Sequence, residues 1–285
     1  DCGNAAGAIC GPDIFKNLNV DLTELFCDVD GTFPNHHPDP TVEANLTDLI
    51  SLMKTGKFDI GIAFDGDADR IGVVDETGDI IWADQLMALF LPEVLEEGDE
   101  ILYDVKCSQA LEKMIVKYGG KPIMWKTGHS LIKQRMGELN CKLGGEMSGH
   151  IFFADDYYGY DDAIYVAARI VQTLSRTDKT LSQLKAELPT YFSTPEMRLE
   201  AESDEEKFRI AKEAVAYFTD NYDCSTIDGV RIQFGDGWGL VRQSNTQPVI
   251  VCRFEANTPE RMAEIQSIVL DKLQTIGSLK LDAGH

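Results

Sequence analysis

The sequence predicts an α/β protein: α/β domains with mixed sheets, followed by a smaller α+β domain at the C-terminal end. Two observations support this fold class. Between residues 84 and 174, short apolar segments alternate with helical segments of about ten residues or more, which is typical of βαβ units with parallel strands. After Pro195, three apolar segments follow one another closely between two helical patterns, which indicates adjacent antiparallel strands.

The first 80 residues combine helical segments with short strands. Leu46, Leu49, Ile50 and Met53 are spaced three and four residues apart, the pattern of a helix with one buried face. A turn at residues 76–79 separates two apolar segments and indicates a β-hairpin. The expected elements are helices at Ile9–Leu18 and Thr41–Thr55, and strands at Thr23–Val29, Phe58–Phe64, Ile71–Val74 and Ile80–Trp82.

The rest of the chain divides into an alternating part and a C-terminal part. The alternating part is expected to contain helices at Asp84–Leu95, Ser108–Tyr118, Ser130–Leu139, Asp161–Leu174 and Leu181–Leu188, with strands at Glu100–Val105, Lys121–Trp125 and Ile151–Phe153. The C-terminal part is expected to contain helices at Glu205–Tyr217 and Pro259–Ile276, with strands at Thr226–Ile232, Gly239–Arg242 and Val249–Glu255. We therefore expect three domains, at residues 1–79, 80–190 and 191–285.

Composition excludes several classes of protein. With 48 acidic and 26 basic residues, the net charge of −22 argues against nucleic-acid binding, which depends on excess Lys and Arg. No apolar segment approaches the roughly 20 residues of a membrane span. The seven cysteines show no C-x-x-C spacing, which favours reduced thiols in a cytoplasmic protein.

The first residues predict that more chain precedes them. Asp1 is followed by a turn rich in Gly and Asn and then by a helical segment. A turn of this kind usually closes a buried strand. We therefore expect a strand, and at least one further domain, upstream of Asp1.

The segment Asp65-Gly66-Asp67-Ala68-Asp69-Arg70 predicts a metal site. Three carboxylates at alternate positions would lie roughly 6–7 Å apart in an extended strand, but Gly66 and Ala68 allow the segment to curl until they converge. Oxygen-only ligands select a hard cation such as Mg²⁺. An EF-hand loop is excluded because Arg70 occupies the position that requires Gly, and the remaining alternative is a solvated acidic turn.

A second acidic motif supports a different hypothesis. Asp28-Val29-Asp30-Gly31-Thr32 is similar to the nucleophile motif of haloacid-dehalogenase-type phosphatases, in which the first Asp accepts the phosphoryl group. No convincing downstream acidic motif of that family accompanies it. A phosphatase that uses Asp28 remains the alternative.

Two polar loops predict ligand binding. Gly144–His150 brings Glu146, Met147, Ser148, Gly149 and His150 together between glycines, with donors and acceptors suited to a sugar diol; the alternative is a tight turn. The second loop suits an anion because its Arg can make a bidentate phosphate contact; the alternative is a polar hairpin loop. Its residues are Arg242, Gln243, Ser244, Asn245, Thr246, Gln247 and Pro248.

Cationic residues follow two expected strands. Lys106 follows the strand ending at Val105, and Lys126 and His129 follow the strand ending at Trp125. Because ligands of open α/β sheets bind at the carboxyl ends of strands, this arrangement favours an anionic ligand.

Taken together, these motifs resemble the α-D-phosphohexomutase superfamily along essentially the whole chain. The resemblance rests on FDGDADR, GEMSGH and RQSNTQP, with DVKCS, KTGHS and FPNHHPDP as subsidiary matches. It implies four domains, of which the first would lie upstream of Asp1. It also implies the interconversion of hexose 6-phosphate and hexose 1-phosphate, of mannose, glucose or both, through a 1,6-bisphosphate and a phosphoserine in that first domain.

The resemblance also implies residue roles. Asp65, Asp67 and Asp69 would hold Mg²⁺, and Arg70 would neutralise the transferring phosphoryl group. Residues 146–150, above all Glu146 and Ser148, would bind sugar hydroxyls, and residues 242–246 would hold the phosphate that does not react. Lys106 and His129 would contact substrate and shuttle the proton. Because no phosphoserine loop of the family occurs in this sequence, a non-catalytic sugar-phosphate-binding fragment is a further alternative.

Overall fold

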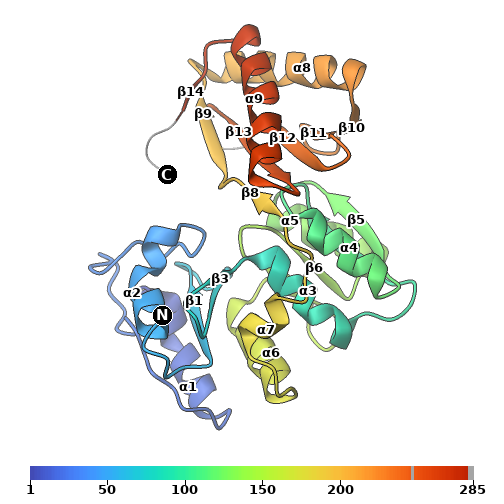
Figure 1. Ribbon diagram of the computed structural model, residues 1–285. Helices are drawn as coiled ribbons and strands as arrows, with labels where there is room; N and C mark the ends of the chain where they lie inside the picture. Colours follow the sequence, from blue (N-terminus) through green and yellow to red (C-terminus); the bar gives the residue numbers. More distant parts are fainter. Residues whose placement is uncertain (245–246, 282–285) are drawn as a thin grey trace. The chain divides into compact units, whose positions relative to one another are not determined.

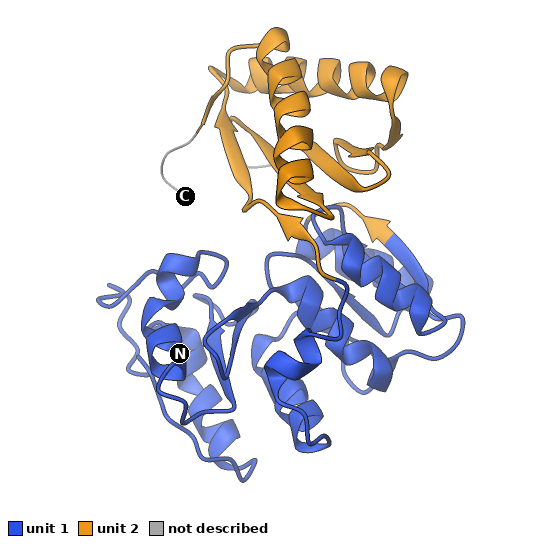
Figure 2. Ribbon diagram, viewed as in Figure 1, with its two compact units in different colours: residues 1–123, 128–189 blue, residues 124–127, 190–285 orange. Residues whose placement is uncertain are grey.

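The structure is a computed structural model that describes residues 1–244 and 247–281. The chain forms two compact units (Figure 2). Unit 1 comprises residues 1–123 and 128–189, and unit 2 comprises residues 124–127 and 190–285. Among the described residues, no helix combines the length and apolar character that a membrane span requires.

Unit 1 begins with a small antiparallel sheet. Its strands are β1 (Ile60–Phe64), β2 (Ile71–Asp75) and β3 (Ile80–Ile81), and β2 pairs with both of the others. The expected hairpin is confirmed. Preceding the sheet are the 3₁₀ helices η1 (Ala6–Ile9) and η2 (Glu43–Leu46), with the helices α1 (Gly11–Lys16) and α2 (Thr47–Met53) (Figure 1).

The helical periodicity at residues 46–53 has the predicted consequence. Leu49 and Met53 of α2 are buried in one cluster with Ala63 of β1 and Val74 of β2. Gly61 of β1 allows this close packing, because a Cβ there would lie 3.0 Å from side-chain atoms of both Leu49 and Met53. The apolar face of α2 therefore fixes β1, the strand that leads into the acidic loop.

The prediction of a strand at Thr23–Val29 is wrong. The segment contains no regular strand, and Phe26 has a left-handed backbone with φ 53°. Two of its carbonyls still accept backbone hydrogen bonds, Leu25 O from Cys2 N–H at 3.0 Å and Phe26 O from Asn4 N–H at 2.8 Å. The left-handed turn interrupts the extended backbone that a strand requires.

The second sheet has the strand order β5-β4-β6-β7. β4 and β6 are parallel, as the alternating pattern predicted, whereas β6 and β7 are antiparallel. The strands are β4 (Glu100–Asp104), β5 (Lys121–Trp125), β6 (Leu143–Gly145) and β7 (Ile151–Phe153). The helices are α3 (Ala83–Val94), α4 (Gln109–Lys117), α5 (His129–Leu139), α6 (Ala163–Ser175) and α7 (Leu181–Lys185).

Sequence analysis did not predict β6 because two of its three residues are glycines, which disfavour strands. The structure shows why glycines are needed there. A Cβ at Gly144 would lie 2.6 Å from the sulfur of Met136, and one at Gly145 would lie 2.7 Å from the sulfur of Met87. At these two positions the strand lies too close to its neighbours to carry a side chain.

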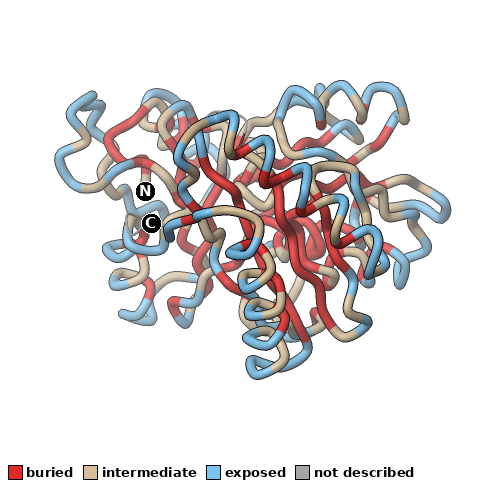
Figure 3. Tube along the Cα trace, turned by 90° about the horizontal axis from the view of Figure 1, so that it is seen from above, coloured by how far each residue is buried: buried red, intermediate tan, exposed pale blue. Residues whose placement is uncertain are grey.

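Unit 2 is a seven-stranded sheet with its core against two long helices, α8 (Asp204–Asn221) and α9 (Pro259–Ile276) (Figure 1). The main strand order is β10-β11-β12-β13-β9-β14, and β8 pairs with β13. The strands are β8 (Phe192–Ser193), β9 (Met197–Glu200), β10 (Asp223–Ser225), β11 (Val230–Gln233), β12 (Gly237–Gln243), β13 (Val249–Ala256) and β14 (Lys280–Leu281). Buried residues follow the strands, and exposed residues follow the loops and outer helix faces (Figure 3).

Two expectations for unit 2 need correction. The strand expected at Thr226–Ile232 begins only at Val230, as β11; residues 226–229 form a turn in which Gly229 has φ 72°, and the strand β10 before this turn was not predicted. The strand expected to end at Arg242 continues through Gln243, which therefore belongs to β12 and not to the loop that follows. The antiparallel arrangement of β11, β12 and β13 agrees with the predicted α+β class.

Candidate functional site

The acidic loop between β1 and β2 brings its three carboxylates together. Ala68 has a left-handed backbone with φ 62°, and the loop closes through a hydrogen bond of 3.2 Å from Asp65 N–H to Arg70 O. Carboxylate oxygens of Asp65, Asp67 and Asp69 all lie within 4.8 Å of one another. The loop therefore curls as its glycine and alanine predicted.

Asp65 holds the loop in this shape. One of its oxygens accepts the backbone N–H groups of Asp69 and Arg70, both at 3.0 Å, and the other accepts Arg70 Nε at 2.7 Å. Arg70 Nη1 also lies 3.3 Å from Asp39 Oδ1. The guanidinium of Arg70 thus joins the acidic loop to the segment at residues 33–40.

The acidic loop fits a divalent cation. Burial, reinforced by the negative charges of Asp65 and Asp67, raises the pKa of Asp69 to about 6, against a partial opposing effect of His150. A cation among these oxygens would relieve that repulsion, and a set of oxygen donors favours a hard cation. Asp65, Asp67 and Asp69 are the residues that would hold it.

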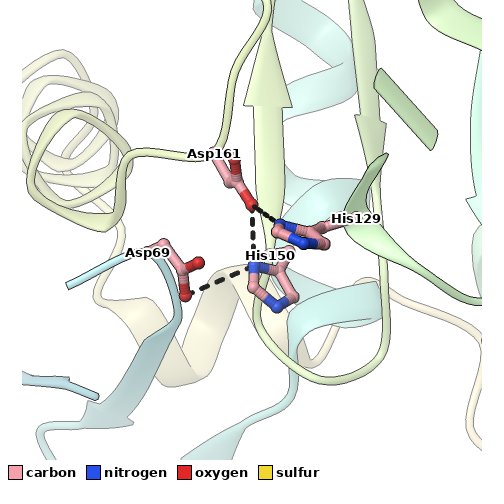
Figure 4. Close-up of side chains that lie close together, drawn as sticks. All are labelled: Asp69, His129, His150 and Asp161. Atoms are coloured by element: carbon pink, nitrogen blue, oxygen red, sulfur yellow. Dashed lines mark hydrogen bonds and ion pairs between the residues drawn. The ribbon is translucent and has the colours of Figure 1, made fainter. Parts of the chain in front are cut away.

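A second cluster shares Asp69 with the acidic loop (Figure 4). His150 Nδ1 lies 3.5 Å from Asp69 Oδ1 and 3.1 Å from Asp161 Oδ2. His129 Nδ1 lies 3.0 Å from the same Asp161 oxygen. We call Asp69, His129, His150 and Asp161 the histidine cluster.

The charges in the histidine cluster favour a protonated imidazole. Burial alone would lower the pKa of His150, but the carboxylates of Asp161 and Asp69 outweigh it, and the pKa of His150 is raised. The pKa of Asp161 is lowered although its burial acts in the opposite direction, because Asp161 forms an ion pair with His150 and is hydrogen-bonded to Lys133 and His129. An ionised Asp161 beside a protonated His150 is a suitable arrangement for general acid catalysis.

Sequence analysis missed Asp161 and Lys133. Asp161 and Asp162 stand together before α6, and Asp162 is the N-cap, accepting the N–H of Tyr165 at 3.0 Å. One acidic residue suffices as an N-cap, so the second was the available signal. Lys133 lies four residues after His129, one helical turn away, and its Nζ donates to Asp161 at 2.8 Å.

The glycine-rich loop between β6 and β7 presents Glu146 beside the histidine cluster. Glu146 is 2% exposed and accepts hydrogen bonds from Gly128 N–H and, at 3.3 Å, from Ser148 Oγ. Its pKa is raised by burial and then by the charge of Asp104. Gly149 has φ 105°, and a Cβ there would lie 2.8 Å from Ile71 O. The loop is therefore packed directly against the start of β2.

Lys106 and Met147 meet through Asp104 at the end of β4. Met147 N–H donates to Asp104 Oδ1 at 3.2 Å, and Lys106 Nζ lies 4.0 Å from Asp104 Oδ2. Lys106 is buried, whereas the side chain of His129 is 49% exposed. The structure thus places two of the three predicted strand-end cations in unit 1, Lys106 near the glycine-rich loop and His129 within the histidine cluster, whereas Lys126 belongs to unit 2.

The strand that leads into the polar loop of unit 2 contains a buried arginine whose guanidinium is incompletely hydrogen-bonded. Arg242 is buried in β12, and its Nε donates to Asp228 Oδ2 at 3.0 Å. Its Nη2 is also buried but has no hydrogen-bond partner among the described residues. A buried donor of this kind favours an anionic ligand, because leaving it unsatisfied is costly.

Lys207 supports this loop and was not predicted from the sequence. Its ammonium is buried and donates to Ser244 O at 3.1 Å and Gln247 O at 2.9 Å. Ser244 N–H donates to Val249 O at 2.9 Å. The predicted residues Asn245 and Thr246 lie outside the described residues.

The second acidic motif does not join either cluster. Asp28 and Asp30 are exposed, and Asp30 accepts hydrogen bonds from the backbone and hydroxyl of Thr32 at 2.9 and 2.7 Å. Asp28 contributes its backbone carbonyl to the side chain of Asn4 at 2.8 Å. The motif has the geometry of an ordinary aspartate-initiated turn.

Comparison with known proteins assigns the family. The family described as phosphoglucomutase/phosphomannomutase matches through its alpha/beta/alpha domain II at residues 1–78, its alpha/beta/alpha domain III at residues 82–192 and its C-terminal domain at residues 196–272. The phosphomannomutase/phosphoglucomutase of Pseudomonas putida is 47% identical over 277 residues, which are 96% of this chain and 59% of that protein.

Two further relatives agree. The phosphoglucomutase of Neisseria meningitidis serogroup A is 45% identical over 271 residues, which are 94% of this chain and 59% of that protein. A crystal structure of a phosphoglucomutase/phosphomannomutase family protein from Burkholderia thailandensis superposes with a TM-score of 0.90 at 42% identity, covering 98% of this chain and 61% of that one. The chain therefore belongs to the phosphoglucomutase/phosphomannomutase family, as its motifs predicted.

Proposed function

We propose that this chain is the metal-, sugar- and phosphate-binding part of a mutase that interconverts hexose 6-phosphate and hexose 1-phosphate, with mannose, glucose or both as the sugar. The observation that carries this proposal is the position of Asp69, which belongs both to the acidic loop and to the histidine cluster. A site for a cation and a positioned proton donor therefore adjoin each other, and phosphoryl transfer to or from a hydroxyl group requires both. The names of the relatives support the same activity.

Asp65, Asp67 and Asp69 would hold the cation, which we propose to be Mg²⁺. When bound, it would supply positive charge that stabilises the transferring phosphoryl group. Arg70 lies against the same carboxylates and would add a second positive charge. In the proposed reaction, a phosphoserine in a part of the protein outside this chain donates the phosphoryl group. The resulting 1,6-bisphosphate reorients in the site and returns its other phosphoryl group to the serine.

We propose His150 as the principal proton carrier. Asp161 orients its ring and keeps it charged, which makes Asp161 a positioning residue. His129 is bound to the same carboxylate but is more exposed. Lys106 and His129, the sequence-based candidates for this role, would then mainly contact the substrate phosphates.

The remaining loops would bind the two ends of the substrate. Buried Glu146 would accept hydrogen bonds from the sugar hydroxyls, and its partner Ser148 would donate one to them. Met147, Gly149 and His150 complete this loop. Arg242 and Ser244, with Gln243, Asn245 and Thr246 from the sequence, would hold the phosphate that does not react. In this proposal the domains at residues 1–79, 80–190 and 191–285 carry the metal, sugar and phosphate loops respectively.

The metal part of the proposal can be tested on this chain alone. Hydrogen exchange of the backbone amides is measured with and without Mg²⁺, and protection should increase at residues 65–70 but not in unit 2. Saturating ligand at 100 times its Kd adds about 2.7 kcal/mol of stability to the state that binds it. Asp67→Asn should abolish the protection, whereas the matched change Asp30→Asn, in the exposed motif, should not. Equal protection in both variants would refute the metal assignment.

The activity can be tested on the full-length protein with glucose 1-phosphate and mannose 1-phosphate. We expect the 6-phosphate to form without release of inorganic phosphate, and Asp28→Asn to retain activity. A phosphatase would instead release phosphate and lose that activity in Asp28→Asn. The 285-residue chain by itself should bind sugar phosphates without turning them over, and turnover by the chain purified free of host mutase would contradict the proposed phosphoserine donor.

A further inference from the structure

Two cysteines of unit 1 that the proposed function does not use lie next to each other. The sulfur atoms of Cys2 and Cys27 are 3.2 Å apart. Cys2 is 3% exposed and Cys27 is partly buried. All seven cysteines of the chain are free thiols, and this pair consists of residues 25 positions apart in the sequence.

The backbone holds the two cysteines side by side. Cys2 N–H donates to Leu25 O at 3.0 Å, and Asn4 N–H donates to Phe26 O at 2.8 Å. These two hydrogen bonds keep the backbones of residues 2–4 and 25–26 next to each other, the close approach that a disulfide requires, with about 4.4–6.8 Å between its Cα atoms. The sulfurs would have to approach from 3.2 Å to about 2.05 Å, which small side-chain rotations can supply.

The pair is also reactive and accessible. The contact with Cys2 is the main cause that lowers the pKa of Cys27, whereas the pKa of Cys2 is raised, so that Cys27 is the cysteine of the pair that more readily forms a thiolate. The thiolate is the form that reacts with oxidants. A cavity of about 640 Å³ in unit 1 is lined by both cysteines, and Cys27, the more exposed of the two, is the one that an oxidant as small as peroxide would reach first.

We propose that Cys2 and Cys27 form a redox-active dithiol site that hydrogen peroxide converts into an intramolecular disulfide. The Cys27 thiolate attacks one peroxide oxygen, the O–O bond breaks, hydroxide leaves, and Cys27 becomes a sulfenic acid. The Cys2 sulfur then attacks Cys27 Sγ and loses its proton, and the sulfenic hydroxyl leaves as water. Two electrons pass from the two cysteines to one peroxide, and two molecules of water result once the hydroxide takes up the proton that Cys27 released on forming its thiolate.

The cross-link would restrain a segment that reaches the candidate site. The segment at residues 25–40 contains Cys27 and ends beside the acidic loop. Near its start, the backbone carbonyl of Asp28 accepts a hydrogen bond from the Asn4 side chain. Near its end, the carboxylate of Asp39 lies 3.3 Å from Arg70 Nη1. Oxidation would therefore fix the start of this segment to the turn after Asp1. Reduced cytoplasmic proteins use disulfides of this transient kind for redox sensing.

The test uses the 285-residue chain with Cys10→Ser, because Cys10 is exposed and lies in the same tryptic peptide as Cys2. The protein is treated with a small excess of hydrogen peroxide, the remaining thiols are blocked with N-ethylmaleimide, and a non-reducing tryptic digest is analysed by mass spectrometry. We expect a cross-linked pair of peptides 1–16 and 17–54, each of which then contains one cysteine. Dithiothreitol should restore both thiols.

Two further variants in the Cys10→Ser background keep the result interpretable. Cys27→Ser should lose the cross-link, and maleimide should then modify the buried Cys2 only after the protein is unfolded. Cys224→Ser, which removes a partly buried cysteine of unit 2, should retain the cross-link. The proposal is overturned if Cys2 and Cys27 both remain reduced while other thiols are oxidised. It is equally overturned if peroxide leaves Cys27 as a sulfinic acid without a cross-link to Cys2.

Discussion

The histidine cluster of unit 1 and the polar loop of unit 2 arrange positive charge in opposite ways. In unit 1, His150 faces two carboxylates and Arg70 is bound to two more. In unit 2, Arg242 is bound to one carboxylate and keeps a buried nitrogen without a partner among the described residues. Paired charges fix the positions of the side chains and their protonation states. A buried donor without a partner instead favours the binding of an anion.

This difference predicts separate kinetic roles. Groups of the histidine cluster should act mainly in the transition state and change kcat when they are altered. Arg242 should contact a phosphate equally in the ground state and the transition state, and its loss should mainly change KM. The variants below test that division in the full-length protein, from the largest expected effect to the smallest.

Replacing His150 should have the largest effect. Because His150→Gln removes the proposed proton carrier, we expect kcat to fall by about 10²–10⁴-fold with little change in KM. Asp161→Asn should lower kcat less, because the imidazole remains but loses its positioning carboxylate. The neighbouring exposed Asp156→Asn is the matched control and should leave both constants unchanged. If steady-state kinetics of His150→Gln show a change in KM and not in kcat, the proposed difference in kinetic role between His150 and Arg242 is wrong.

Removing the arginine of unit 2 should affect binding. Arg242→Ala loses a charge-assisted contact worth about 1.5–3 kcal/mol, so KM should rise by roughly 10–150-fold while kcat changes little. Arg242→Lys should recover only part of the loss, because an ammonium cannot make the bidentate contact. Arg209→Ala, on the exposed face of α8, is the control within the same unit. Unchanged KM and kcat in Arg242→Ala would mean that the loop is only a polar turn.

The difference between the two regions also explains how much the sequence could predict. Asp65, Asp67 and Asp69 are contiguous, and glycine or alanine between them allows convergence, so local rules sufficed. The pairing of His150 with Asp161 spans 11 residues and depends on how β7 and α6 pack. The acidic pair Asp161-Asp162 was the one local signal, but it does not identify His150 as the partner of Asp161, and that contact was therefore missed.

Long-range packing limited the fold prediction in the same way. Helix α9 was predicted at its bounds because apolar spacing and the Thr258 cap are local signals. β6 was missed because its glycines are required by side chains of two helices that pack against it, Met87 of α3 and Met136 of α5. The strand expected at Thr23–Val29 failed because its apolar residues favour a strand, but Phe26 adopts a left-handed turn.

Replacing Glu146 should reduce activity on both sugars alike. Glucose and mannose phosphates differ only at C2, and a carboxylate can accept hydrogen bonds from two of the hydroxyls that they share. Glu146→Gln should lower kcat/KM for both by a similar factor of about tenfold or more. The exposed Glu138→Gln on α5 is the matched control. Loss of only one substrate in paired kinetics would show that Glu146 recognises C2.

The smallest expected effect concerns the shape of the acidic loop and requires only this chain. Ala68 has φ 62°, a conformation that costs an L-residue roughly 1–2 kcal/mol and glycine almost nothing. The greater freedom of glycine in the unfolded chain offsets about 0.5–1 kcal/mol of that gain. Ala68→Gly should therefore raise the free energy of unfolding by up to about 1 kcal/mol. Ala167→Gly, the same change inside helix α6, should lower it by about 1 kcal/mol or more. Urea denaturation measures both, and a loss at Ala68 as large as at Ala167 would show that the loop is not strained at this residue.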